Sequence, residues 1–299
     1  MTEPTETDMA ETTNRITQVT RDGLTFDVDD DGPIAGDLVV LLHGFPERST
    51  SWRLVAPQLH TAGLRTLAMD QRGYSTGARP KRRRDYRVNE LIADVVALID
   101  AAAPGRRVHV VGHDWGAVVA WGIAQQHPDR VATLTAVSVP HPMAFVTAMV
   151  RSGQLLKSWY MFAFQAPRLP ELLLGRLQKA SDRQLAATGM TRDDLERVRT
   201  EIIDDGALPG ALGWYRALLL NNPADIRRRV TVPTTFVWSD GDVAIGPWGA
   251  EHSGDWVDAP YTYVELAGVS HWIPTQAPDA LAEAILEQVS GRSDEQGEA

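Results

Sequence analysis

The sequence predicts an α/β fold, in which a mostly parallel sheet carries helices on both faces and an all-helical insert covers one edge. Short apolar runs alternate with segments of helical periodicity from residue 38 to 137 and again from 234 to 289. The apolar runs are continuous, which is typical of parallel strands buried on both faces. Residues 141–229, between these two stretches, are helical in pattern and rich in aromatic side chains.

The elements follow one another in a regular order along the chain. Strands are predicted at residues 38–42, 64–69, 108–111 and 131–137, and helices at 51–61, 88–103 and 117–127. After the insert, strands are predicted at 234–238 and 261–266, a helix or loop at 246–258, and a final helix at 279–289. The second of the helices is typical of an amphipathic surface helix, because Leu91, Val95 and Leu98 share one face.

This order of elements predicts one domain with an insert. We expect an α/β core formed by residues 15–139 and 230–292, with a helical lid at 140–229. Ligands of such sheets bind at the carboxyl edge, so the lid is expected to cover the binding site. Residues 1–14 and 293–299 are polar and lack periodicity, and both ends are therefore expected to be disordered.

The composition excludes several classes of function. The chain has 299 residues and a net charge of −10, which argues against nucleic acid and anionic membranes as main partners. It has no cysteine, which excludes disulfides, thiol catalysis and zinc–thiolate sites. The N-terminus lacks the basic and apolar regions of a signal peptide, and the apolar runs are too short to span a membrane. A cytoplasmic protein is expected.

The strongest chemical signal is the segment from Val110 to Ala117. Here a predicted strand runs through a sharp turn directly into a helix, with the nucleophile-elbow pattern G-x-Nu-x-G and Asp114 at the nucleophile position. The strained turn leaves little room for side chains two residues before and after Asp114. Gly112 and Gly116 occupy these two positions. The N-terminus of the following helix favours the ionised carboxylate. Asp114 is therefore the candidate nucleophile, with a simple helix cap as the alternative.

A second segment matches a similar pattern but is not followed by a helix. Residues 73–77 match G-x-S-x-G around Ser75, but the basic run at 79–84 follows instead of a helix. Ser75 is therefore rejected as a nucleophile. We interpret the basic run as a solvated loop.

A turn directly after the first strand offers hydrogen-bond donors. His43-Gly44-Phe45-Pro46 follows the apolar run at 38–42, beside the expected position of the elbow. The backbone N–H groups of Phe45 and Trp115 can then point at one site and form an oxyanion hole. Pro46 can fix the turn, including as a cis peptide.

The candidate base is His271, in a loop between the last strand and the last helix. Imidazole near neutral pH suits a general base, and a loop at the carboxyl edge can reach the elbow. The acid that orients it should follow a late strand, where Asp240 and Asp242 are both available. We favour Asp242, because Gly241 permits the turn that carries it back over the sheet edge, and keep Asp240 as the alternative.

In chain order these residues resemble those of the α/β-hydrolase superfamily and, within it, the epoxide hydrolases. The resemblance covers residues 20–290 and rests on the segments at 43–47, 70–75 and 112–116 together with Asp242 and His271. It implies that Asp114 opens an epoxide to form an ester, which water activated by His271 and Asp242 then hydrolyses. No cofactor or metal is implied. The expected partners are a small apolar epoxide and water, and the expected state is a monomer or homodimer.

Epoxide hydrolases of this type hold the epoxide oxygen with two lid tyrosines. The resemblance assigns this role to Tyr160 and Tyr215, the only tyrosines between residues 141 and 229. The predicted substrate-binding residues are Phe45, Trp115, His141, Trp159 and Phe164. Further apolar lid side chains, Phe145, Phe162 and Leu218, favour an apolar substrate.

Three other functions remain open. Haloalkane dehalogenases resemble this chain in the Asp nucleophile and the His–Asp pair, and Trp115 suits halide binding. However, many of them carry Asn where this chain has Phe45, and paired lid tyrosines have no use in halide release. Fluoroacetate dehalogenases carry Arg where Trp115 stands. A non-enzymatic ligand-binding protein would need a broken triad or lost tyrosines, whereas every part is present here.

Overall fold

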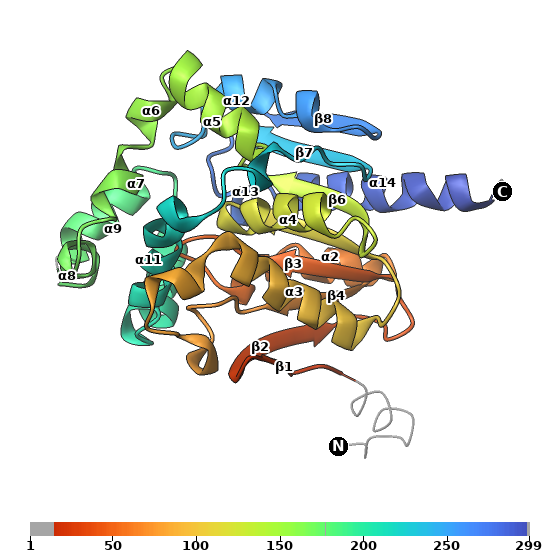
Figure 1. Ribbon diagram of the computed structural model, residues 1–299, viewed down its shortest axis with the longest axis horizontal. Coiled ribbons are helices and arrows are strands. Elements are labelled where there is room, and N and C mark those ends of the chain that lie inside the picture. Colours follow the sequence, from red (N-terminus) through yellow and green to blue (C-terminus); the bar gives the residue numbers. More distant parts are fainter. Residues whose placement is uncertain (1–14, 177, 298–299) are drawn as a thin grey trace.

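One sheet of eight strands organises the molecule (Figure 1). The computed structural model describes residues 15–176 and 178–297. The strand order is β1-β2-β4-β3-β5-β6-β7-β8. Their bounds are β1 Gln18–Arg21, β2 Leu24–Asp31, β3 Leu38–Leu42, β4 Arg65–Met69, β5 Val108–His113, β6 Val131–Val137, β7 Thr234–Ser239 and β8 Tyr261–Leu266. From β4 to β8 all neighbours are parallel, which confirms the predicted α/β sheet. The antiparallel strands β1 and β2 were not predicted.

Helices cover both faces of the sheet (Figure 1). One face carries α3 (Val88–Ala102) and α4 (Trp115–Gln126), and the other carries α2 (Ala56–Thr61), α13 (Ile273–Gln276) and α14 (Pro278–Gly297). Alternate side chains of β3 enter different cores: Val40 and Leu42 pack with the helices of the first face, and Val39 and Leu41 with those of the second. This two-sided burial is why the strand is apolar throughout.

The helix bounds differ from the prediction in two places. The segment at 51–61 is not one helix but a 3-10 turn, η1 (Ser49–Trp52), followed by α2, which begins next to Pro57. The final helix α14 extends to Gly297, so residues 293–297 are helical rather than part of a disordered tail. The predicted disordered segment 1–14, and residues 298–299, lie outside the described residues.

The chain between β6 and β7 forms a group of short helices. They are α5 Pro142–Arg151, α6 Gln154–Lys157, α7 Trp159–Ala163, α8 Leu169–Arg176, α9 Gln178–Ala186, α10 Arg192–Arg197, the π-helix η4 Val198–Asp204, α11 Leu208–Ala217, η5 Leu218–Leu220 and η6 Asp225–Arg227. Phe45 and Trp115, which follow β3 and β5, make ring contacts with Tyr215 of α11. These helices, which we call the lid, therefore lie over the carboxyl edge of the sheet. The segment between β7 and β8 is also helical, with α12 at Pro247–Glu251 and η7 at Gly254–Trp256.

The lid meets the core at a contact between two backbones. Gly73, at φ 98°, faces Gly210 of α11. A Cβ on Gly73 would lie 2.7 Å from the Gly210 carbonyl carbon, and one on Gly210 would lie 2.5 Å from the Gly73 carbonyl oxygen. Next to this contact, the Trp214 indole donates a 2.7 Å hydrogen bond to the Arg72 carbonyl. Helix α11 is thus seated directly on the core.

Candidate active site

Asp114 lies at the sharp turn between β5 and α4. Its backbone has φ 52° and ψ −119°, a conformation that a side-chain-bearing residue rarely adopts. A Cβ on Gly112 would collide with the Gly116 carbonyl, and a Cβ on Gly116 would collide with the Leu42 carbonyl. The turn therefore needs both glycines, as the elbow pattern indicates. The Asp114 side chain projects from the N-terminus of α4 and is almost fully buried.

Two groups hold the Asp114 carboxylate. The Phe45 N–H donates to Oδ1 at 2.8 Å, and His271 Nε2 lies 3.3 Å from Oδ2. Burial alone would raise the pKa of Asp114, but the hydrogen bond and charge of His271, together with the Phe45 N–H, lower it below the ordinary value of 3.8. The carboxylate is therefore ionised at neutral pH.

His271 lies in the loop between β8 and α13 and is held by Asp242. Its Nδ1 is 2.6 Å from Asp242 Oδ2, while Asp242 Oδ1 accepts the N–H groups of Ala244 and Ile245 at 2.7 and 2.8 Å. Burial lowers the pKa of His271, but the charge of Asp242 and the hydrogen bonds with both carboxylates outweigh it and raise the pKa to about 10. His271 is thus cationic at neutral pH while both carboxylates are charged.

Of the two candidate acids, only Asp242 contacts His271. Asp240 turns toward the neighbouring loop, where its Oδ1 accepts the Gly268 N–H at 2.6 Å. A Cβ on Gly241 would lie 2.5 Å from the Val269 carbonyl oxygen, so the turn passes close under the His271 loop. This close passage is what brings residue 242 back over the sheet edge.

The turn after β3 is fixed by His43 and Gln71. The Gln71 N–H donates to His43 Nε2 at 3.0 Å, and the Gln71 side chain donates to the His43 carbonyl at 2.7 Å. Burial lowers the pKa of His43 to about 4, which keeps Nε2 an acceptor. The Phe45–Pro46 peptide is cis, and the Phe45 N–H points at Asp114. The Trp115 N–H, the other predicted donor, is the first of α4.

Two tyrosines from the lid lie over the elbow. Tyr160 belongs to α7 and Tyr215 to α11, and their ring centroids are 6.0 Å apart. Burial, reinforced by the charge of Asp114, raises the pKa of both phenols above the ordinary value of 10, so both hydroxyls stay protonated. Trp115 packs edge-on against Tyr215 at 5.0 Å between ring centroids. The lid therefore brings two hydrogen-bond donors to the side of Asp114 that faces the cavity.

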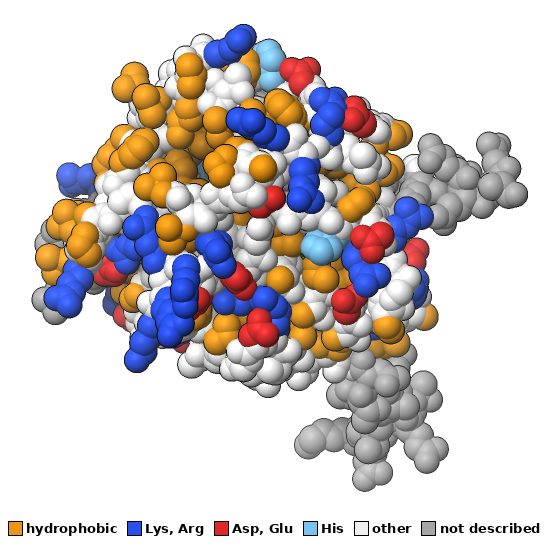
Figure 2. Space-filling model, viewed as in Figure 1, with side chains coloured by type: hydrophobic (Ala, Val, Ile, Leu, Met, Phe, Trp, Pro, Cys, Tyr) orange, Lys and Arg blue, Asp and Glu red, His pale blue; other side chains and the backbone are white. Residues whose placement is uncertain are grey.

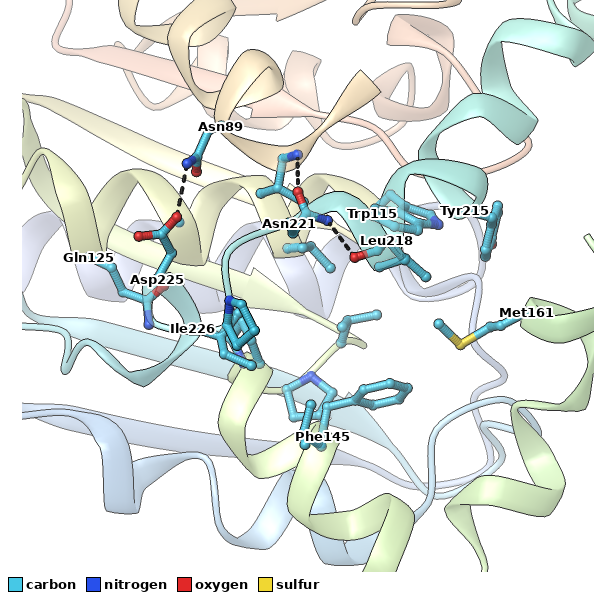
Figure 3. A pocket seen from close by; sticks show the side chains of 18 of the residues that line it. Asn89, Trp115, Gln125, Phe145, Met161, Tyr215, Leu218, Asn221, Asp225 and Ile226 are labelled. Carbon is cyan, nitrogen blue, oxygen red and sulfur yellow. Dashed lines mark hydrogen bonds between the residues drawn. The ribbon is translucent and has the colours of Figure 1, made fainter. Parts of the chain in front are cut away.

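A cavity of about 350 Å³ joins these residues (Figure 3). Asp114, Trp115, Tyr160 and Tyr215 line it together with apolar lid side chains. The other main lining residues are Val118, Gln126, Val139, Phe145, Val146, Met149, Met161, Leu218 and Ile245, with Asn89, Gln125, Asn221 and Asp225 at the end far from Tyr215. At that far end Asn89 donates to Asp225 at 2.9 Å and the Val88 N–H donates to Asn221 at 2.8 Å. The cavity is apolar at its centre and polar only at its ends.

The comparisons with known proteins agree with this geometry. A family model described as the alpha/beta hydrolase fold matches residues 37–278. The chain belongs to the α/β-hydrolase family. The chain is 33% identical to "AB hydrolase superfamily protein YfhM" of Bacillus subtilis over 92% of its length and 97% of that protein. It is 30% identical to "Epoxide hydrolase A" of Mycobacterium tuberculosis, over 91% of this chain and 96% of that one. The crystal structure of Epoxide Hydrolase A from Mycobacterium thermoresistibile superposes with a TM-score of 0.76 at 27% identity, over 92% of this chain and 97% of that one.

Several predicted substrate-binding residues of this α/β-hydrolase lie elsewhere. His141 is fully buried at the N-terminus of α5, stacks on Trp256 at 5.3 Å and has Nε2 2.8 Å from Gln125 Nε2, so it is a structural residue. Trp159 is 58% exposed, because the face of α7 that carries it points away from the core. The rings of Phe45 and Phe164 pack on Tyr215 behind the cavity lining. Of the five, only Trp115 lines the cavity.

Sequence reasoning missed part of the lining. Met149 and Met161 line the cavity, as does Asn221 after η5. A signal for the first was present, because Phe145 and Met149 are spaced i and i+4 and so share one face of α5. Met161 and Asn221 carry no comparable signal, since their positions depend on the path of the lid.

Ser75, the rejected nucleophile, is a buried structural residue. Its hydroxyl donates to the Asp70 carbonyl and accepts the Asp27 N–H, both at 2.8 Å. Within residues 15–176 and 178–297, no cluster of three or more His, Asp or Glu side chains is arranged to hold a metal ion. In the same residues, no helix is long and apolar enough to cross a membrane.

Proposed function

We propose that this α/β-hydrolase converts an apolar epoxide to a vicinal diol through a covalent ester on Asp114. The observation that carries the proposal is the surroundings of one carboxylate. Asp114 is held between the Phe45 N–H and His271 and faces a cavity that it shares with Tyr160 and Tyr215. Relatives named epoxide hydrolases, at about 30% identity over most of the chain, support the same reaction.

The first step is ring opening. Asp114 Oδ2, the oxygen outside the Phe45 hydrogen bond, attacks an epoxide carbon, and the carbon–oxygen bond of the ring breaks. Negative charge develops on the departing oxygen, which takes a proton from Tyr160 or Tyr215 and becomes a hydroxyl. Phenols that stay protonated because of their burial suit this task, since they donate most strongly when the alkoxide forms.

The second step is hydrolysis of the ester. Water attacks the Asp114 carbonyl carbon while His271 accepts its proton, and the carbonyl electrons move to Oδ1. That oxygen already accepts the Phe45 N–H, and the Trp115 N–H at the start of α4 is the second donor for the oxyanion. Collapse of the intermediate breaks the ester carbon–oxygen bond; the leaving alkoxide takes the remaining proton of the attacking water, which releases the diol and restores the carboxylate. A carboxylate is required here, because a serine would leave a stable ether.

The charges around His271 determine its protonation state in each of the two steps. Both Asp114 and Asp242 raise its pKa while they are ionised. Alkylation of Asp114 removes one of these charges, so the pKa falls and His271 releases its proton, which replaces the one that the tyrosine gave up. His271 is then neutral when water must be deprotonated. Over one turnover, epoxide and water give diol with every protein group restored.

The alternative of a haloalkane dehalogenase has less support. Halide release needs N–H donors that are free to bind an anion; Trp115, whose ring packs edge-on against Tyr215, offers one, and the Phe45 side chain offers none. Two protonated phenols beside the nucleophile serve an oxygen leaving group. A purely ligand-binding role leaves the connected set of Asp114, His271 and Asp242 without a purpose.

The experiment is a single turnover of styrene oxide in water enriched in oxygen-18, with enzyme in excess. The proposal expects label in the Asp114 carboxylate and an unlabelled diol. The tryptic peptide 108–130 also contains Asp129, so fragmentation must assign the label, and Asp114→Asn is the control. Label in the diol alone would mean direct attack by water and would overturn the ester. Absence of diol would redirect the test to chloro- and bromoalkanes.

A further inference from the structure

The exposed hydrophobic side chains of the described residues are concentrated on the lid. All but Leu54 and Val243 of the large ones lie between residues 146 and 220. They are Val146, Val150, Leu155, Leu156, Trp159, Phe162, Leu169, Leu172, Leu173, Leu219 and Leu220. Figure 2 shows hydrophobic side chains gathered on the side of the molecule that α5 to α8 occupy in Figure 1. Apolar surface concentrated in this way marks an interaction site.

The same surface carries positive charge in an acidic protein. Residues 142–170, which span α5 to α7, contain Arg151, Lys157 and Arg168 but no Asp or Glu, although the whole chain has a net charge of −10. The basic run at 81–84 adjoins this surface, because Arg83 hydrogen-bonds to Gln165 just after α7. The charge of residues 142–170 is therefore opposite in sign to that of the chain as a whole, and the acidic residue of α8, Glu171, is paired with Arg216.

We propose that the lid helices α5 to α8 form a docking surface for an anionic lipid bilayer. Apolar and aromatic side chains can enter the acyl-chain layer of a bilayer, and the flanking Lys and Arg side chains can bind its anionic headgroups. Trp159 and Phe162, both mostly exposed, are of the types that favour this boundary. The binding is peripheral, since no described helix can cross the membrane.

Charge favours a bilayer over a second copy of the chain. In a twofold dimer this surface would face itself, and Arg151, Lys157 and Arg168 would find no acidic partner among residues 142–170 of the second copy. An anionic surface neutralises them instead. The overall charge predicted no membrane partner, but that prediction averages over a molecule whose charges are unevenly distributed.

The docking surface adjoins the mouth of the cavity. Val146 is 44% exposed and also lines the cavity, and Leu219, which is 82% exposed, follows the lining residue Leu218. A lipophilic substrate dissolved in the acyl layer could therefore reach Asp114 without crossing water. The docking itself does not depend on the chemistry at Asp114, so binding and activity can be tested separately.

The test is flotation of the full-length protein with vesicles of phosphatidylcholine containing about one-third phosphatidylglycerol. Leu156→Glu and Val150→Glu place a charge on side chains that are 80% and 86% exposed, with Leu54→Glu, at a 42% exposed site on the core, as the matched control. Arg151→Glu tests the charge, with Arg107→Glu, an exposed residue at the far end of β5, as its control. Hydrolysis of styrene oxide in free solution, together with melting temperature, reports that each variant is folded.

We expect the wild type to bind these vesicles and to detach as salt is added, because salt screens the attraction. Arg151→Glu should weaken binding by roughly 30-fold, and the two lid Glu variants by at least about tenfold, whereas both controls bind like the wild type. Failure of the wild type to float with anionic vesicles would overturn the proposal. So would a dimer, seen by light scattering, that Leu156→Glu converts to a monomer, because a second copy would then cover the surface.

Discussion

Asp242 Oδ2 and His271 Nδ1 lie 2.6 Å apart, with both groups buried, while the opposite nitrogen of the ring faces Asp114. One imidazole thus joins two carboxylates that follow different strands of the sheet. Its orientation is set from the Asp242 side, where two backbone N–H groups fix the carboxylate. The pKa of His271 therefore depends on which of the two carboxylates, Asp114 and Asp242, is ionised.

Asp242→Asn should slow ester hydrolysis far more than ring opening. The amide removes the charge that holds His271 as a base, and loss of such an orienting carboxylate costs roughly 10⁴-fold. Stopped mixing with excess styrene oxide should show one equivalent of alkylated enzyme accumulating, and mass spectrometry should find it on Asp114. Asp240→Asn is the matched control, because Asp240 accepts only the Gly268 N–H, and it should turn over like the wild type. Equal loss in both variants would contradict the role of Asp242.

Removal of either lid hydroxyl should slow ring opening. Tyr160→Phe and Tyr215→Phe each lose one donor to the developing alkoxide, and we expect a decrease in the alkylation rate of roughly 10- to 100-fold for each variant, with a larger decrease for the double variant. Tyr263→Phe is the control, since its hydroxyl contacts Glu265 on the exposed strand β8. The measurement is the single-turnover rate of ester formation. Wild-type rates in the double variant would exclude the tyrosines from the reaction.

Alanine at position 44 should disable the site. A Cβ there would collide with the Asp114 side chain, lying 2.5 Å from Oδ1, and the carboxylate would have to leave the Phe45 N–H. Because a displacement of this size costs roughly 10²-fold, kcat/KM should fall by at least that factor. Gly153→Ala is the control, because a Cβ at Gly153 meets nothing within 4 Å. The ester-forming rate and the melting temperature together separate misplacement of Asp114 from unfolding.

Protonation of His271 should make the stability of the folded protein depend on pH. The ordinary pKa of His271 is 6.5 and the folded pKa is about 10, so the folded state binds the proton more tightly. The stability it contributes is complete below pH 6.5 and is lost as the pH rises toward 10. The melting temperature of the wild type should therefore exceed that of His271→Gln most at pH 6, and the difference should shrink by pH 10.

His141 should affect the pH dependence of stability in the opposite direction to His271. Burial lowers its folded pKa to about 3, so the unfolded state binds the proton more tightly. The wild type should lose stability as the pH falls from 6.5 toward 3, and His141→Gln should flatten that decrease. A flat alkaline difference for His271→Gln, beside a normal acid difference for His141→Gln, would contradict the buried ion pair.

The sheet was predictable because its signal is local. Every strand from β3 to β8 is a short apolar run, or nearly so, and the elbow glycines are required by the backbone of Asp114 itself. The strands β1 and β2 were not predicted because β2 contains four Asp residues and its burial alternates, as is typical of an antiparallel strand with one face partly exposed. His271 was predictable from its place after the last strand.

The lining of the cavity was not predictable to the same degree. Trp159 and Tyr160 are neighbours in one short helix, yet one is exposed and the other lines the cavity. Which of them turns inward depends on how α7 packs on the core, and a five-residue helix has too little periodicity to reveal it. The position of His141 outside the cavity lining was unpredictable for a similar reason, since its neighbours Gln125 and Trp256 come from distant parts of the chain.

The backbone contact between Gly73 and Gly210 has a consequence for which molecules can enter. No side chain separates α11 from the core at this contact. The helix that carries Tyr215 therefore cannot move closer to the core, and no side chain between the two can change its conformation to let it shift. The position of Tyr215 relative to the core is thus set by a backbone contact and not by side chains that could repack. We therefore expect substrates to be distinguished by the width of the group that must lie between Tyr215 and Asp114.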